Sequence, residues 1–139
     1  MNPVLKVRDV CLSYHTLSGE TPALSHISFD LMPGEFLSIV GPSGCGKSTM
    51  GRAILRLHEP TSGKVYFEGR DILSCNKKQL KDLRKDMQII FQDPFASLNP
   101  RMTVSEAIIE PLLVQGIYKA SERAAITRRV EKIMNLVGL

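Results

Sequence analysis

The stretch Gly41-Pro42-Ser43-Gly44-Cys45-Gly46-Lys47-Ser48-Thr49 constrains the fold of this chain more than any other. It follows an apolar run, residues 36–40, and precedes residues 49–57, which have the composition of a helix. Its glycines let the backbone bend where a Cβ atom would clash, so that successive N–H groups can point at one anion. A helix that begins there adds unpaired N–H groups and the positive end of its dipole. The stretch therefore predicts a strand, an anion-binding loop and a helix, in that order.

The spacing G-x-x-x-x-G-K-[ST] is that of the phosphate-binding loop of nucleotide triphosphatases. In such a loop Lys47 contacts the β- and γ-phosphates, and the Ser48 hydroxyl is a ligand of Mg²⁺. The alternative is a flexible Gly/Ser turn with a solvated lysine, which fits less well because a strand and a helix flank the loop. The predicted nucleotide-binding residues are Gly41, Pro42, Ser43, Gly44, Cys45, Gly46, Lys47, Ser48 and Thr49.

The composition limits the remaining classes of function. The net charge of +4 suits an anionic ligand but is too small to indicate nucleic acid. The three cysteines have no metal-binding spacing, which favours a reduced, cytosolic protein. The N-terminus lacks the features of a signal peptide, and no apolar stretch approaches the roughly 18 residues of a membrane helix. We therefore expect any membrane role to come through a partner.

The N-terminal part predicts an antiparallel piece of sheet. Residues 4–14 and 24–31 alternate between apolar and polar side chains, the first with some irregularity, and turn residues 16–22 lie between them. In Met32–Glu35, Pro and Gly occupy the second and third positions of a type II turn. Three strands in quick succession would then lead into the phosphate-binding loop.

The middle of the chain predicts two more strands around a polar helix. Residues 64–68 and 87–91 have the composition of strands, and 77–85 that of a short helix with a solvated basic face. An unusual loop, 92–100, follows the second of these strands.

Two helices are predicted near the C-terminus. Thr103 and Glu106 form a capping box, so one helix should begin near Val104, be kinked at Pro111 and end by Gly116. Ser121 is expected to cap the last helix. The apolar stripe of that helix is Ile126, Val130, Ile133 and Val137.

Together, the glycine-rich loop, Phe91-Gln92-Asp93-Pro94 and Tyr14 resemble the nucleotide-binding subunit of an ABC transporter. Residues 87–104 are similar to the ATP-binding proteins of dipeptide, oligopeptide and nickel importers. The resemblance implies an α/β fold of the P-loop NTPase type. Within it, 1–35 would be an antiparallel β piece, 36–100 the P-loop core with its Q-loop and part of the core sheet, and 101–139 the start of a helical subdomain.

The same resemblance implies the roles of single residues. Tyr14 would stack on adenine; the alternative is an ordinary core aromatic. Gln92 would contact Mg²⁺ and the attacking water, so that Lys47 and Gln92 are the catalytic residues and Ser48 and Gln92 the metal ligands. Without the surrounding motif, Gln92 would read as a plain loop residue. The implied cofactors are ATP and Mg²⁺.

The resemblance also implies partners. The segment Asp93–Pro100 would face a transmembrane permease subunit, which would cover Phe95 and Leu98; alternatively these side chains pack on this chain's own core. A second ATP-binding subunit is expected, and no nucleic acid. The implied function is ATP binding and hydrolysis that drives dipeptide or oligopeptide import, at the cytoplasmic face of the membrane.

The family pattern continues with an L-S-G-G-Q signature, a strand ending in Asp-Glu and a later histidine, and none of these occurs in the 139 residues. We therefore expect the N-terminal part of a longer ATPase, or a natural truncation, that hydrolyses ATP poorly by itself. Exposed apolar surface and self-association are expected to accompany this. Two alternatives stay open: a soluble ABC-type ATPase acting on nucleic acid or ribosomes, and a non-catalytic nucleotide-binding module.

Overall fold

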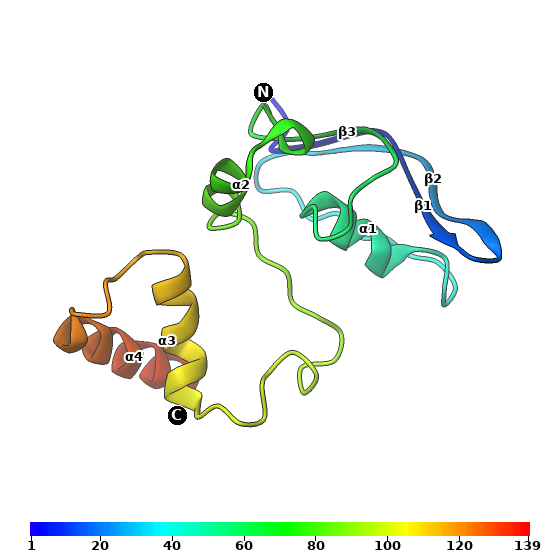
Figure 1. Ribbon diagram of the computed structural model, residues 1–139. Helices are drawn as coiled ribbons and strands as arrows, with labels where there is room; N and C mark the ends of the chain where they lie inside the picture. Colours follow the sequence, from blue (N-terminus) through cyan, green and yellow to red (C-terminus); the bar gives the residue numbers. More distant parts are fainter. The chain divides into compact units, whose positions relative to one another are not determined.

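A computed structural model describes residues 1–139, which form two compact units, Met1–Met87 and Gln88–Leu139 (Figure 1). The first unit contains the strands, the glycine-rich loop and two helices. The second contains an irregular segment followed by two helices.

The first unit is built on one antiparallel sheet of four strands in the order β2-β1-β3-β4. The strands are β1 (Leu5–Thr16), β2 (Gly19–Leu31), β3 (Ser62–Phe67) and β4 (Arg70–Asp71). The hairpin of β1 and β2 is longer than predicted, because residues 19–22 continue the ladder up to the pair Thr16↔Gly19. The turn at Met32–Glu35 is confirmed: Gly34 has φ 73° and the Glu35 N–H donates to the Met32 carbonyl at 3.1 Å.

A β-bulge explains the irregular alternation in β1. Val7 and Val10 are both 1% exposed, which a strand of period two allows only if it contains an extra residue between them. Asp9 is at the bulge, with φ 50° and a shift of register on either side of it. On β2, His26 also has φ 50°, and its Nδ1 lies 2.6 Å from Asp9 Oδ1. The bulge keeps both valines in the core.

One helix covers the buried side of the hairpin, and two short elements complete the core. They are α1 (Lys47–Ile54), the 3₁₀ turn η1 (Ile72–Ser74) and α2 (Lys77–Leu83). The buried core residues are Leu5, Val7, Val10, Leu12, Leu24, Met50, Ala53, Val65, Ile72 and Leu83. Helix α1 ends three residues before the predicted Leu57, and Arg56, just beyond it, has φ 52°.

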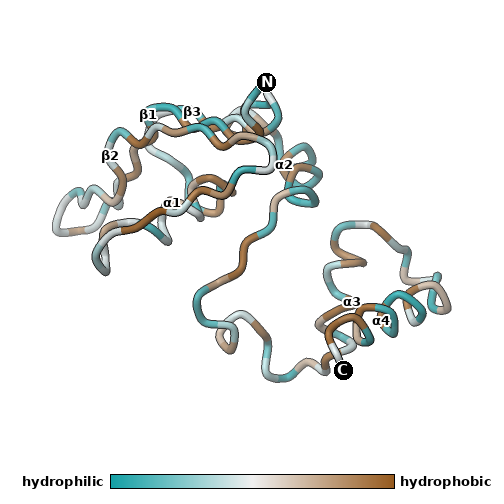
Figure 2. Tube along the Cα trace, turned by 180° about the vertical axis from the view of Figure 1, so that it is seen from behind, coloured by the Kyte–Doolittle hydropathy of each residue, from teal (hydrophilic) through white to brown (hydrophobic).

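The predicted strands 36–40 and 87–91 are wrong: neither segment belongs to the sheet. Phe36, Val40 and Ile90 are 91%, 89% and 96% exposed. A β-strand forms only where another strand completes its ladder of hydrogen bonds, and the sheet offers these segments no partner. The predicted part of the core sheet is therefore not formed, and the expected exposed apolar surface is present. Figure 2 shows the second segment as a hydrophobic stretch that follows α2.

The second unit consists of α3 (Val104–Val114) and α4 (Arg123–Val137). The capping box of α3 is confirmed, since the Thr103 N–H donates to Glu106 Oε2 at 2.7 Å and the Glu106 N–H to Thr103 Oγ1 at 3.2 Å. The helix runs through Pro111.

The cap expected for α4 is wrong. The N-cap residue is Glu122, not Ser121, and the Glu122 carboxylate accepts the Lys119 N–H at 2.6 Å. Along the predicted stripe, Ile126 and Val130 are buried, whereas Val137 is 65% exposed. No helix in the structure has the length and apolar character needed to cross a membrane.

Gly63 is predicted to be essential for the stability of the sheet. It has φ 97°, and a Cβ atom on it would lie 2.5 Å from the Asp9 carbonyl oxygen and 2.6 Å from Val10 Cα. We expect Gly63→Ala to lower the free energy of unfolding by about 2–4 kcal/mol, measured by urea denaturation. Gly69→Ala is the matched control, because Gly69 has φ 79° but open space around it, and it should cost about 1–2 kcal/mol. Equal losses would contradict the close contact.

Acid is predicted to weaken the first unit through Asp71. Burial raises the pKa of this carboxyl, but hydrogen bonds from Ser74, Lys64 and the Leu73 N–H outweigh burial, so the pKa lies below its ordinary value. Stability from the ionised form is therefore present above about pH 4 and lost as pH falls through the lowered pKa. Asp71→Asn should make urea unfolding less dependent on pH between about 5 and 2. An unchanged pH dependence would refute this assignment.

Candidate functional site

The glycine-rich loop leads directly into α1. Gly46, with φ 98°, is the N-cap residue, and its carbonyl accepts the first helical hydrogen bond from the Met50 N–H at 2.9 Å. No side chain caps this end, and the first turn holds no acidic residue. The first N–H groups of α1 and the positive end of its dipole are therefore available to an anion.

Gly46 also fixes the loop against the sheet. A Cβ atom on it would lie 2.7 Å from the Ala23 carbonyl oxygen and 3.1 Å from Leu24 Cδ2, both on β2. Only glycine allows so close an approach together with a left-handed backbone. The beginning of α1 is thereby held at a defined place on β2.

Lys47 bends back over the loop. Its Nζ donates to the carbonyl oxygens of Gly41 and Pro42, each at 2.6 Å, and lies 3.5 Å from Cys45 Sγ. The loop thus has a positive charge beside its own backbone. A phosphate oxygen is a stronger, charged acceptor for an ammonium group than these carbonyls are. Ser48, the next residue, is exposed.

Tyr14 lies near the end of β1, at the same end of the hairpin as the loop. Two residues before it, Leu12 pairs with Leu24, which contacts Gly46. Two residues of strand span about 7 Å. Tyr14 is 39% exposed and is not a core residue. Its hydroxyl lies 2.8 Å from His58 Nδ1. The backbone of Tyr14 therefore lies a short way along the hairpin from the strand residues that contact the loop.

Gln92 belongs to the other unit, where it is exposed in the irregular segment before α3. The next residues form a compact loop: Asp93 Oδ1 accepts the N–H groups of Phe95 and Ala96 at 3.0 and 3.2 Å. Phe95 and Leu98 are 90% and 62% exposed, so the rest of the second unit does not cover them. The role of Gln92 beside the loop stays a prediction.

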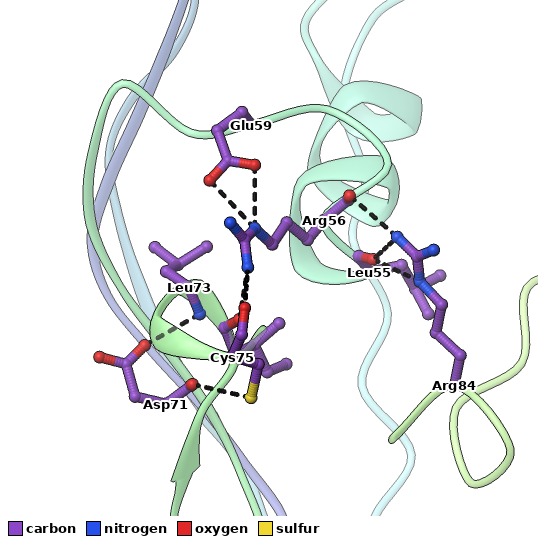
Figure 3. Close-up of polar contacts among 8 residues, drawn as sticks. Leu55, Arg56, Glu59, Asp71, Leu73, Cys75 and Arg84 are labelled. Carbon is purple, nitrogen blue, oxygen red and sulfur yellow. Dashed lines mark hydrogen bonds and ion pairs between the residues drawn. The ribbon is translucent and has the colours of Figure 1, made fainter. Parts of the chain in front are cut away.

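The sequence did not reveal an arginine cluster at the C-terminal end of α1 (Figure 3). Arg84 donates to the carbonyls of Leu55 and Arg56 at 3.0–3.2 Å. Arg56 donates to the Cys75 carbonyl at 2.7 Å and pairs with Glu59 at 2.9 Å. A hydrogen bond to Glu59 raises the pKa of Arg56. Apart from the Arg56–Glu59 pair, these contacts join residues 19 or more positions apart, so no local pattern signals them.

Comparisons with known proteins show the family of the chain. Residues 24–139 match the family model described as ABC transporter. A Brucella ovis protein, named as a peptide import ATP-binding protein, is 45% identical over 127 residues. The match covers 91% of this chain and 40% of the Brucella protein. The glutathione import ATP-binding protein GsiA of Escherichia coli K12 is 46% identical over 144 residues, 99% of this chain and 23% of its own. The chain therefore spans less than half the length of these relatives.

Solved structures show the same fold. A dimeric ATP-binding cassette in a post-hydrolysis state, bound to ADP and Pi, superposes with a TM-score of 0.78 at 29% identity, covering 97% of this chain and 57% of that one. CbiO1 of Clostridium perfringens, part of the transporter complex CbiONQ, gives 0.69 at 27% identity, covering 100% and 52%. The family model and these likenesses confirm the resemblance seen in the sequence: this chain belongs to the ABC transporter family.

Proposed function

We propose that this chain is part of the ATP-binding subunit of a peptide importer, which binds ATP and, as a whole protein, hydrolyses it to drive transport. The observation that carries the proposal is a single loop that combines the uncapped N-terminus of α1 with the Lys47 ammonium group, which donates to the Gly41 and Pro42 carbonyls. The names of the relatives, which refer to peptide and glutathione import, support the choice of solute.

In this proposal, residues Gly41–Thr49 bind the phosphates through backbone N–H groups, and Lys47 contacts the β- and γ-phosphates. Tyr14 stacks on the adenine ring. The structure has no group of three His, Cys, Asp or Glu side chains that could hold a metal. This suits Mg²⁺, which keeps waters and binds phosphate oxygens with one or two protein ligands, taken here to be Ser48 and Gln92. When bound, Mg²⁺ neutralises charge on the phosphates.

The proposed partners follow from the exposed loop of the second unit. Phe95 and Leu98 would contact a permease subunit through the segment Asp93–Pro100, which places the protein at the cytoplasmic face of the membrane. A second ATP-binding subunit would complete the site, as in the dimeric cassettes to which this chain is similar. Gln92 would position the attacking water. The proposed boundaries are 1–35, 36–100 and 101–139, for the β piece, the P-loop core and the start of the helical subdomain.

Lys47→Ala tests the phosphate-binding loop. Loss of a charged hydrogen bond to phosphate should weaken ATP binding about 10- to 100-fold, measured by isothermal titration calorimetry with Mg²⁺. The ATP-dependent rise in unfolding temperature should disappear as well. Lys78→Ala, which removes an exposed lysine of α2, is the control and should leave both unchanged. An unaltered affinity in Lys47→Ala would refute the assignment.

Tyr14→Ala tests the adenine contact. Base stacking on an aromatic side chain contributes about 1–3 kcal/mol, so ATP should bind about 5- to 100-fold more weakly. Inorganic triphosphate, which has no base, should bind within about twofold of the parent affinity. Tyr118→Ala in the second unit is the control. If ATP and triphosphate weakened equally, Tyr14 would have a structural role only.

A further inference from the structure

His58 contacts Tyr14, the residue that we propose stacks on adenine. Its Nδ1 lies 2.8 Å from the Tyr14 hydroxyl, and the two rings form a T-shaped pair with centroids 5.8 Å apart and planes at 83°. His58 is half-buried in the turn that follows α1. The sequence motifs give this histidine no role, and it is 44 residues from Tyr14 along the chain.

The turn that carries His58 is joined to the strand that carries Tyr14. The Thr61 N–H donates to the Cys11 carbonyl at 2.8 Å, and Thr61 Oγ1 accepts the Ser13 N–H at 2.9 Å. Both contacts lie within three residues of Tyr14 on β1. Thr61 therefore ties the turn that carries His58 to the part of β1 that carries Tyr14.

The other side of the turn is fixed to α1. The N–H groups of Leu57 and His58 both donate to the Arg52 carbonyl, at 2.8 and 3.3 Å. The Arg84 guanidinium group donates to the Arg56 carbonyl, and the Arg56 guanidinium group donates to the carbonyl of Cys75, the residue that follows η1 (Figure 3). His58 is thus presented to Tyr14 from a rigid support, and that support begins at the phosphate-binding loop.

A tyrosine at the exposed end of a hairpin can rotate about two side-chain torsions, and freezing them on binding costs affinity. A hydrogen bond to the hydroxyl and an edge contact fix the ring plane in advance. We propose that His58 is a positioning residue that holds the Tyr14 ring in the orientation for stacking on the base of an adenine nucleotide. This inference rests on the proposed function, and in particular on stacking by Tyr14.

The test compares affinities for ATP and for inorganic triphosphate by calorimetry. His58→Ala should weaken ATP about 3- to 10-fold and leave triphosphate within about twofold, because only the base contact depends on the ring. Tyr14→Phe, which removes only the hydroxyl, should weaken ATP by a similar factor. Adding His58→Ala to Tyr14→Phe should weaken ATP little further, because both changes break one hydrogen bond. His58→Asn, whose amide oxygen can accept from the hydroxyl, should restore most of the affinity.

His15→Ala is the matched control, since His15 is an exposed histidine next to Tyr14 on the same strand. If Tyr14→Ala changes the ratio of the two affinities but His58→Ala and Tyr14→Phe do not, the positioning role is wrong while the proposed stacking stands. If Tyr14→Ala leaves the ratio unchanged, stacking itself is wrong. If His58→Ala weakens both ligands equally and Tyr14→Phe weakens neither, His58 is only structural and the inference is overturned.

Discussion

The contact between Gly46 and β2 is the constraint on which the rest of the site depends. It brings the beginning of α1 against the Ala23 carbonyl, at a distance that no side chain would permit. Through this contact the N-terminus of α1 lies beside Leu24, whose partner on β1, Leu12, is two residues from Tyr14. In the function that we propose, the sheet contributes by holding both the start of α1 and the strand that carries Tyr14.

The hairpin can play that role because its irregularities are compensated. The bulge at Asp9 shifts the alternation of buried and exposed side chains along β1, and Val7 and Val10 both stay buried. On the neighbouring strand, Gly63 fits against the bulge because it lacks a Cβ atom. Beyond the bulge, β1 turns Leu12 into the core while the ring of Tyr14 stays partly exposed. A regular strand in the register of Leu5 and Val7 would place Leu12 on the opposite face.

Features with local causes could be predicted from the sequence, and features with distant causes could not. The type II turn, the Thr103–Glu106 capping box and the helix that follows the glycine-rich loop each depend on a few neighbouring residues, and each of these predictions holds. The strands at 36–40 and 87–91 fail because a strand needs partners that an apolar run cannot specify. Ser121 fails because α4 begins at Arg123, so that Glu122 is the N-cap residue and no side chain caps the helix. The Arg56–Arg84 cluster and the His58–Tyr14 pair could not be predicted, since both join residues separated by 28 or more positions.

The extended segment 36–40 has one more consequence, which concerns entropy. The phosphate-binding loop is anchored after Gly46 by a helix and a sheet contact, but no strand ladder holds the residues that precede it. If an anion binds here, as we propose, ordering the backbone costs about 1–2 kcal/mol for each loop residue that only the anion fixes. The cost of ordering the loop then offsets part of the favourable interaction energy with phosphate. A neighbouring strand that paired with residues 36–40 would, in the function that we propose, favour phosphate binding without touching the phosphate.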